Sequence, residues 1–147
     1  MFDIAFIPDA PIYTSEDGWS GQWGRVQLGD FIERFIAPLG RWDQSDYKRQ
    51  WIDGAQRLID GERRSAFMVE AGRLWWTAWR DGSKIYIQQQ LLIDEDLSPA
   101  CTARAANLPY DLIGTRESHS EDGEMLSEWL ISLDDLREFM SRSKEIQ

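Results

Sequence analysis

The sequence contains little of the chemistry on which metal proteins and many enzymes depend. Its 147 residues include one cysteine, Cys101, and one histidine, His119. A single cysteine excludes an internal disulfide and a cysteine-based zinc site, and a single histidine excludes the HExxH motif and paired-histidine metal sites. No GxxxxGK[ST] phosphate loop occurs either. We therefore expect neither a metal nor a cofactor.

Long apolar stretches are also missing. The longest run without a charged residue is Ile85–Ile93, nine residues, whereas a helix that spans a membrane needs about 18 or more. The first nine residues have no basic side chain and are interrupted by Asp3 and Pro8, but a secretory signal combines a basic start with an apolar run. We expect no membrane contact and a cytoplasmic protein.

Basic residues are few and scattered. Lysine and arginine total 16 against 26 acidic residues, a net charge of −10. Nucleic-acid-binding surfaces need clustered positive charge, and the only adjacent basic pairs are Lys48-Arg49 and Arg63-Arg64, so we expect no nucleic-acid partner. The excess acid lies in residues 94–147, with 13 acidic and 5 basic side chains, against 13 and 11 in residues 1–93.

This acidic end is either a solvated surface or a docking face for a basic partner. An acidic field accelerates association with a basic protein and discourages wrong partners. Neither of its two acidic clusters has the D-x-[DN]-x-[DN]-G spacing of a calcium loop. The candidate contacts for a basic partner are Asp94, Glu95, Asp96, Glu121, Asp122 and Glu124.

Residues 44–60 have the periodicity of an amphipathic helix. Their large apolar side chains recur at spacings of three and four, on one face of a 3.6-residue period. Asp43 or Ser45 can cap the start, and Gly61 ends the pattern.

The remaining sequence alternates apolar and polar residues, which is typical of short strands. A last helix begins after Ser132, with Asp135 as the second half of a capping box. We expect one α+β domain, residues 1–147, with a curved antiparallel sheet of about six to eight strands, a central helix at about 44–60 and a C-terminal helix at about 133–142. The expected strands cover residues 2–7, 22–28, 31–36, 65–71, 73–80 and 84–93, and an acidic-tipped hairpin joins residues 112–118 to 125–133.

Asp81-Gly82 is the strongest hairpin signal in the sequence. A two-residue turn there would pair Ala78 with Ile85 and Trp76 with Ile87, and would separate an apolar face from an aromatic and polar one. The aromatic side chains of that second face either pack under other elements or form a recognition surface, because aromatic residues are common interface anchors. They are Trp75, Trp79 and Tyr86.

Catalysis has weak support. His119 follows Ser118, but adjacent residues of a strand point to opposite sides, and a catalytic triad needs its members to converge on one point. Cys101 lacks a nearby activating base in the sequence and resembles a small buried apolar residue more than a nucleophile. We expect no catalytic residues and a binding protein rather than an enzyme.

Several stretches between about residues 3 and 136 match, in order, a bacterial family. They are Trp23–Phe35, Pro38-Leu39 with Trp42, Asp46–Trp51, Lys84–Leu91, and Glu121–Glu124 through to Ser127-Glu128-Trp129. This set resembles the immunity proteins of contact-dependent growth inhibition systems. The resemblance implies a protein that binds the toxic C-terminal domain of a large cell-surface effector delivered by neighbouring bacteria. Many such toxins are nucleases, whose clefts must be basic to hold phosphates.

The expected function is therefore neutralisation of a cognate toxin domain, with a nuclease favoured, by 1:1 occlusion. The free protein is expected to be a monomer that forms a heterodimer with the toxin. The candidate toxin contacts are the two acidic clusters and the aromatic hairpin face. Two alternatives stay open: a carbohydrate or small-ligand binding module that uses the aromatic face, and a small hydrolase centred on His119.

Overall fold

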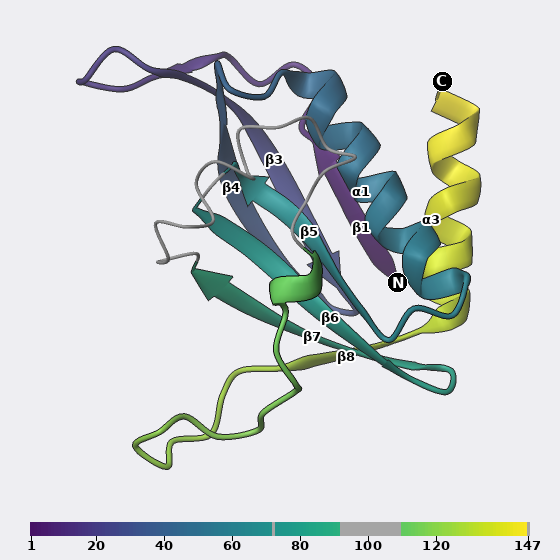
Figure 1. Ribbon diagram of the computed structural model, residues 1–147. Helices are drawn as coiled ribbons and strands as arrows, with labels where there is room; N and C mark the ends of the chain where they lie inside the picture. The colour runs from purple at the N-terminus through teal and green to yellow at the C-terminus, as the bar shows by residue number, and fades with distance from the viewer. Residues whose placement is uncertain (72, 92–109, 147) are drawn as a thin grey trace.

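The computed structural model describes residues 1–71, 73–91 and 110–146 (Figure 1). Within these residues the chain forms eight strands, two α-helices and one 3₁₀ turn. They are β1 (Phe2–Phe6), β2 (Tyr13–Thr14), β3 (Ser20–Leu28), β4 (Phe31–Leu39), α1 (Gln44–Ile59), β5 (Arg64–Glu70), β6 (Leu74–Asp81), β7 (Lys84–Leu91), η2 (Tyr110–Leu112), β8 (Trp129–Ser132) and α3 (Leu133–Ile146).

The strands form two four-stranded antiparallel sheets. In the N-terminal sheet, β3 has β1 and β2 on one side and β4 on the other. The C-terminal sheet has the order β5-β6-β7-β8. The α+β class, the antiparallel pairing and both expected helices are confirmed. The strands are divided between two sheets because the chain leaves the first at β4, passes through α1 and enters the second at β5.

Helix α1 begins at a complete capping box. The Asp43 side chain accepts a hydrogen bond from the backbone N–H of Asp46, and the Asp46 side chain accepts one from that of Asp43. Of the two caps that the sequence offered, Asp43 is therefore the one used. Gly61, with φ of +107°, lies just past the end of the helix, as expected from the sequence.

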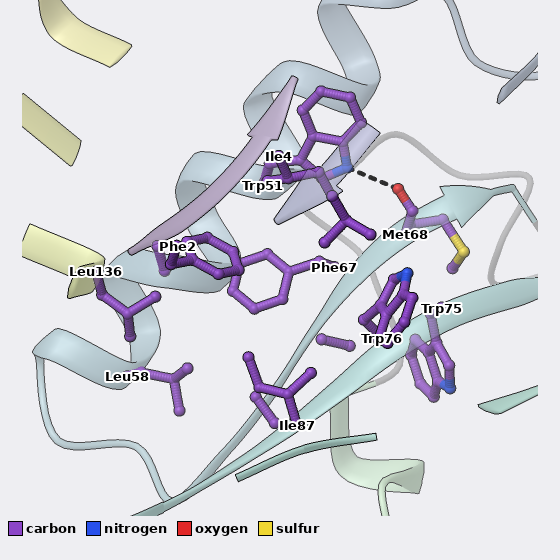
Figure 2. Close-up of a cluster of buried hydrophobic side chains, with 14 of the residues drawn as sticks. Phe2, Ile4, Trp51, Leu58, Phe67, Met68, Trp75, Trp76, Ile87 and Leu136 are labelled. Atoms are coloured by element: carbon purple, nitrogen blue, oxygen red, sulfur yellow. Dashed lines mark hydrogen bonds between the residues drawn. The ribbon is translucent and has the colours of Figure 1, made fainter. Parts of the chain in front are cut away.

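Polar side chains of α1 form hydrogen bonds with backbone groups at the outer edge of β5, which has no neighbouring strand on that side. The Gln50 amide donates to the Ala66 carbonyl (2.6 Å) and accepts from the Met68 N–H (2.6 Å), and the Trp51 indole donates to the Met68 carbonyl (2.7 Å; Figure 2). An uncovered edge strand would invite pairing with another chain. The helix lies so close that a Cβ on Gly54 would be 2.5 Å from the Ala66 oxygen.

Both sheets and both helices contribute to one apolar core (Figure 2). Phe2 of β1 packs against Phe67 of β5 and Phe139 of α3, with ring centroids 5.0 and 5.1 Å apart. The two sheets meet where Phe31 stacks on Trp129, at 4.5 Å. Burial of each such ring contributes about 1.5–3 kcal/mol. The core therefore ties the first strand of the chain to its last helix.

The predicted pairing of β6 with β7 is wrong by two residues. Asp81 pairs with Lys84 and Ala78 with Ile87, so the two turn residues are Gly82 and Ser83 rather than Asp81 and Gly82. Gly82 has φ of +60°, as the first turn position of a type II′ hairpin requires. A shift of two residues leaves every side chain on its predicted face, so the separation into two faces is correct.

The C-terminal helix starts as the sequence indicated. The Ser132 hydroxyl accepts from the Asp135 N–H (3.1 Å), and the Asp135 carboxylate accepts from the Ser132 N–H (2.9 Å). Leu133, Leu136 and Met140 of α3 are buried against the core. The helix continues to Ile146, four residues beyond its expected end.

Candidate functional site

A hairpin loop with an acidic tip projects from the body of the protein, between η2 and β8 (Figure 1). We call residues 118–126 the acidic hairpin. His119 and Met125 form a β-bridge, and the Ser120 N–H donates to the Glu124 carbonyl at 2.8 Å. The Gly123 N–H closes the tip by donating to the Ser120 carbonyl at 2.9 Å, so the expected hairpin exists.

The tip presents carboxylates to solvent without a basic neighbour in sequence. Glu121, Asp122 and Glu124 are all exposed, and residues 117–128 contain no lysine or arginine. Met125 lies beside them and is 80% exposed, the highest value among the large apolar residues that the structure describes. A protruding acidic turn with one apolar side chain suits contact with a basic protein surface.

A charged pair fixes the base of the acidic hairpin to the C-terminal sheet. The Arg116 guanidinium donates to both oxygens of Glu128, at 2.7 and 2.5 Å, and lies 3.8 Å over the Tyr86 ring. Gln88 donates to Glu128 and to the Glu117 carbonyl, both at 2.8 Å. Hydrogen bonding from Arg116 holds the pKa of Glu128 below its ordinary value. These contacts orient the hairpin relative to the sheet.

The sequence analysis missed this pair, although a signal was present. Arg116 and Glu128 are equidistant from Asp122, as are the bridged residues His119 and Met125. Opposite charges at facing positions of a hairpin stabilise its register. The expected hairpin therefore already implied the contact.

The aromatic face of the β6–β7 hairpin is covered rather than free. Trp75 and Trp79 are only 3% and 6% exposed, and the Trp79 indole donates to the Gly114 carbonyl at 2.8 Å. Tyr86 is half-buried beneath Arg116. Gly114 and Arg116 thus lie over part of this face, and the expected contact of Trp75 and Trp79 with a toxin remains a prediction. The same burial removes the surface that the carbohydrate or small-ligand alternative needs.

Asp94, Glu95 and Asp96, and also Cys101, lie outside the described residues. Their expected roles remain predictions. The acidic hairpin is the one predicted acidic cluster that the structure describes.

His119 and Ser118 lie closer together than the sequence argument assumed. The Ser118 Oγ and His119 Nδ1 are 2.9 Å apart, so their side chains do not point to opposite sides. The reason is that only one isolated bridge forms here and the backbone bends at Ser118. Both side chains are exposed, in an open loop rather than in an enclosed site where a catalytic pair excludes water.

Metal and membrane sites find no support in the described part of the chain. Across residues 1–71, 73–91 and 110–146, no three His, Cys, Asp or Glu side chains gather as they would around a metal ion. No helix in these ranges has the length and apolar character needed to cross a membrane.

Comparison with known proteins gives the family. Residues 37–139 match the family described as the CdiI N-terminal domain. Over 146 residues, 95% of this chain, the sequence is 25% identical to the immunity protein CdiI of Enterobacter cloacae, of which 96% is covered. A chain in the solved CdiA-CT/CdiI toxin and immunity complex from Enterobacter cloacae has the same fold, with a TM-score of 0.81 at 23% identity and 99% of both chains covered. The chain belongs to the CdiI N-terminal domain family.

Proposed function

We propose that this chain is an immunity protein that neutralises the C-terminal toxin domain of a contact-dependent growth inhibition effector. Membership of the CdiI N-terminal domain family is the observation that carries the proposal. The similar Enterobacter cloacae protein is an immunity protein, and the solved structure with this fold is a toxin and immunity complex.

The acidic hairpin supports a mechanism by charge complementarity. Its three tip carboxylates project into solvent on a turn whose base is fixed by Arg116 and Glu128. A nuclease toxin needs a basic cleft to bind phosphates, and such a cleft is electrostatically complementary to this tip. We therefore favour a nuclease as the target, blocked by occupation of its basic surface.

The chain acts stoichiometrically in this proposal. Residues 1–147 form one functional unit, since the core joins Phe2 of β1 to Phe139 of α3. One chain binds one toxin domain in the cytosol, and protection requires at least as much immunity protein as toxin. No turnover takes place, because the toxin is occluded rather than modified.

The test combines association kinetics with protection of cells. The probe is the C-terminal domain of the effector encoded beside this chain. Changing Glu121→Lys, Asp122→Lys and Glu124→Lys together should slow association about tenfold or more at low salt. A control with Asp60→Lys, Glu62→Lys and Glu138→Lys makes the same charge change at exposed positions elsewhere and should have a smaller effect.

Two outcomes would contradict the proposal. Absence of binding between the unmodified chain and the toxin domain would remove the immunity function. Protection of cells by a trace of the chain against a large excess of toxin would show turnover, and an enzyme would then replace the stoichiometric inhibitor. Equal on-rates for the two triple variants would remove only the acidic hairpin from the interface.

A further inference from the structure

A second exposed feature lies in the N-terminal sheet, where β2 pairs with the start of β3. Three side chains form what we call the aromatic cluster: Tyr13 of β2, Trp19 of the loop between β2 and β3, and Trp23 of β3. The Tyr13 ring centroid is 5.4 Å from that of Trp19 and 6.4 Å from that of Trp23. Tyr13 and Trp19 are 37% and 41% exposed, and the neighbouring Ile12 is 51% exposed. The Tyr13 ring thus contacts both indoles at the surface, and none of the three rings is fully buried.

The loop that carries the aromatic cluster is ordered by its own hydrogen bonds. The Trp19 N–H donates to the Ser15 hydroxyl (3.0 Å), the Ser15 N–H donates to the Trp19 carbonyl (2.9 Å), and the Gly18 N–H donates to the Ser15 carbonyl (3.1 Å). The Trp19 ring lies over Gly21, where an added Cβ would be 3.1 Å from its Cζ3 atom. A ring held in place before binding loses little conformational entropy when a partner arrives.

Exposed carboxylates neighbour the aromatic cluster in sequence, and we call them its rim. Glu16 and Asp17 lie in the loop between β2 and β3, and Asp9 lies in the loop between β1 and β2. Residues 1–24 contain no lysine or arginine. The cluster therefore combines exposed indole and phenol rings with a rim of exposed carboxylates, and its complement is a surface that presents arginine or lysine. Such cations can pair with the carboxylates and also lie over the ring faces.

From this combination we propose that the aromatic cluster is a second contact surface for the toxin domain and supplies its main apolar anchor. The inference rests on the proposed function. Interfaces gain most of their affinity from a few Trp, Tyr and Arg residues surrounded by weaker polar contacts, and the cluster with its rim has that composition. Figure 1 shows its loop and the acidic hairpin both on the side of the molecule away from α3.

The two surfaces have different roles. The acidic hairpin is charged and mainly sets the rate of association, whereas the aromatic cluster is apolar at its centre and mainly sets the rate of dissociation. Loss of the cluster should therefore shorten the lifetime of the complex without slowing its formation.

The test measures binding of the full chain to the effector's C-terminal domain by surface-based kinetics. Tyr13→Ser with Trp19→Ser should raise the dissociation constant at least tenfold, mostly through faster dissociation. Ile32→Ser is the matched control: Ile32 is 55% exposed on β4 of the same sheet, and its removal should change the dissociation constant less than twofold. A thermal melt of each variant checks that it is folded, and Trp19→Phe gives a milder second variant with a smaller loss.

The charged rim is tested separately. Glu16→Lys with Asp17→Lys should slow association, compared with Glu62→Lys and Glu138→Lys as the equal charge change elsewhere.

Unchanged binding of the folded Tyr13/Trp19 variant, alongside tight binding of the unmodified chain, would overturn this inference and leave the proposed function intact. Failure of the unmodified chain to bind would instead overturn both. Binding of a soluble oligosaccharide at the cluster, lost in Trp19→Phe, would assign it to a carbohydrate ligand and also overturn the inference.

Discussion

Two hairpins of this protein carry several aromatic side chains each but leave them in opposite environments. In the β6–β7 hairpin Trp79 is 6% exposed, whereas next to the β2–β3 pair Trp19 is 41% exposed. The difference comes from the segment at Gly114 and Arg116, which caps Trp79 with a hydrogen bond and covers Tyr86 with a guanidinium. Neither the number of aromatic residues nor their alternation with other residues therefore shows which face of a hairpin is exposed to solvent.

The comparison also shows what each hairpin contributes. Covered rings hold the C-terminal sheet and the base of the acidic hairpin together. Exposed rings near Tyr13 add little to stability and are available to a partner. Changes in the two hairpins should therefore separate stability from binding.

The largest expected effect is on the covered side. Trp79→Ala should lower the free energy of unfolding by about 3–5 kcal/mol, because it empties a packed site and removes the hydrogen bond to Gly114. Urea unfolding followed by circular dichroism measures it. Trp19→Ala is the matched change on the exposed side and should cost less than about 1 kcal/mol. If Trp79→Ala leaves the fold too unstable to purify, Trp79→Phe should show a smaller loss in the same direction.

A reversed order would break the comparison. Should Trp19→Ala destabilise the chain more than Trp79→Ala, the rings near Tyr13 would be structural. Their proposed role in binding would then lose its support.

The sequence predicts the elements of this fold better than what covers them. Helix α1 follows from local spacing, its Asp43 cap is one of the two that the sequence offered, and both faces of β6 follow from alternation. The packing of Gly114 over Trp79 joins residues 35 positions apart, and no local pattern contains it. The predicted acidic hairpin is confirmed as a hairpin, whereas its role in binding stays a prediction.

The pairing register of β6 and β7 also depends on contacts that a local sequence pattern does not contain. Asp81-Gly82 and Gly82-Ser83 are both acceptable two-residue turns by composition, and the choice is made by the pairing of both strands over their full length. Because the predicted and observed registers differ by two residues, each side chain still lies on the face that was predicted for it.

A medium effect is expected at the turns of the two hairpins. Gly82→Val should destabilise the chain by about 1–2 kcal/mol, since a β-branched residue is disfavoured at φ of +60°. Nothing lies within 4 Å of a Cβ there, so the cost comes from the backbone alone. Ser83→Val is the control, because Ser83 has no positive φ, and it should be nearly neutral in thermal melts.

Gly18→Val makes the corresponding change in the other hairpin. Gly18 has φ of +87°, so the backbone cost should be similar, but its loop also positions Trp19. We expect Gly18→Val to weaken toxin binding as well as stability, and Gly82→Val to change stability alone. Equal binding by the two folded variants would contradict this difference.

The smallest expected effect tests the contact that covers the β6–β7 aromatic residues. Glu128→Gln removes the charge that Arg116 faces and should cost up to about 1 kcal/mol at pH 7, since the pair is partly exposed to solvent. Hydrogen bonding from Arg116 lowers the pKa of Glu128 in the folded chain below its ordinary value of 4.5. The folded state therefore binds a proton less readily than the unfolded state, so this contribution is complete above about pH 4.5 and is lost as the pH falls through the folded-state pKa.

Urea unfolding of the unmodified chain and of Glu128→Gln from pH 7 to pH 3 should show the difference between their free energies of unfolding shrinking on acidification. Glu70→Gln is the control, because Glu70 lies 3.7 Å from a largely exposed Arg73 and its loss should cost less at every pH. A difference that stays constant down to pH 3 would show that the charge of Glu128 does not hold this segment over Tyr86.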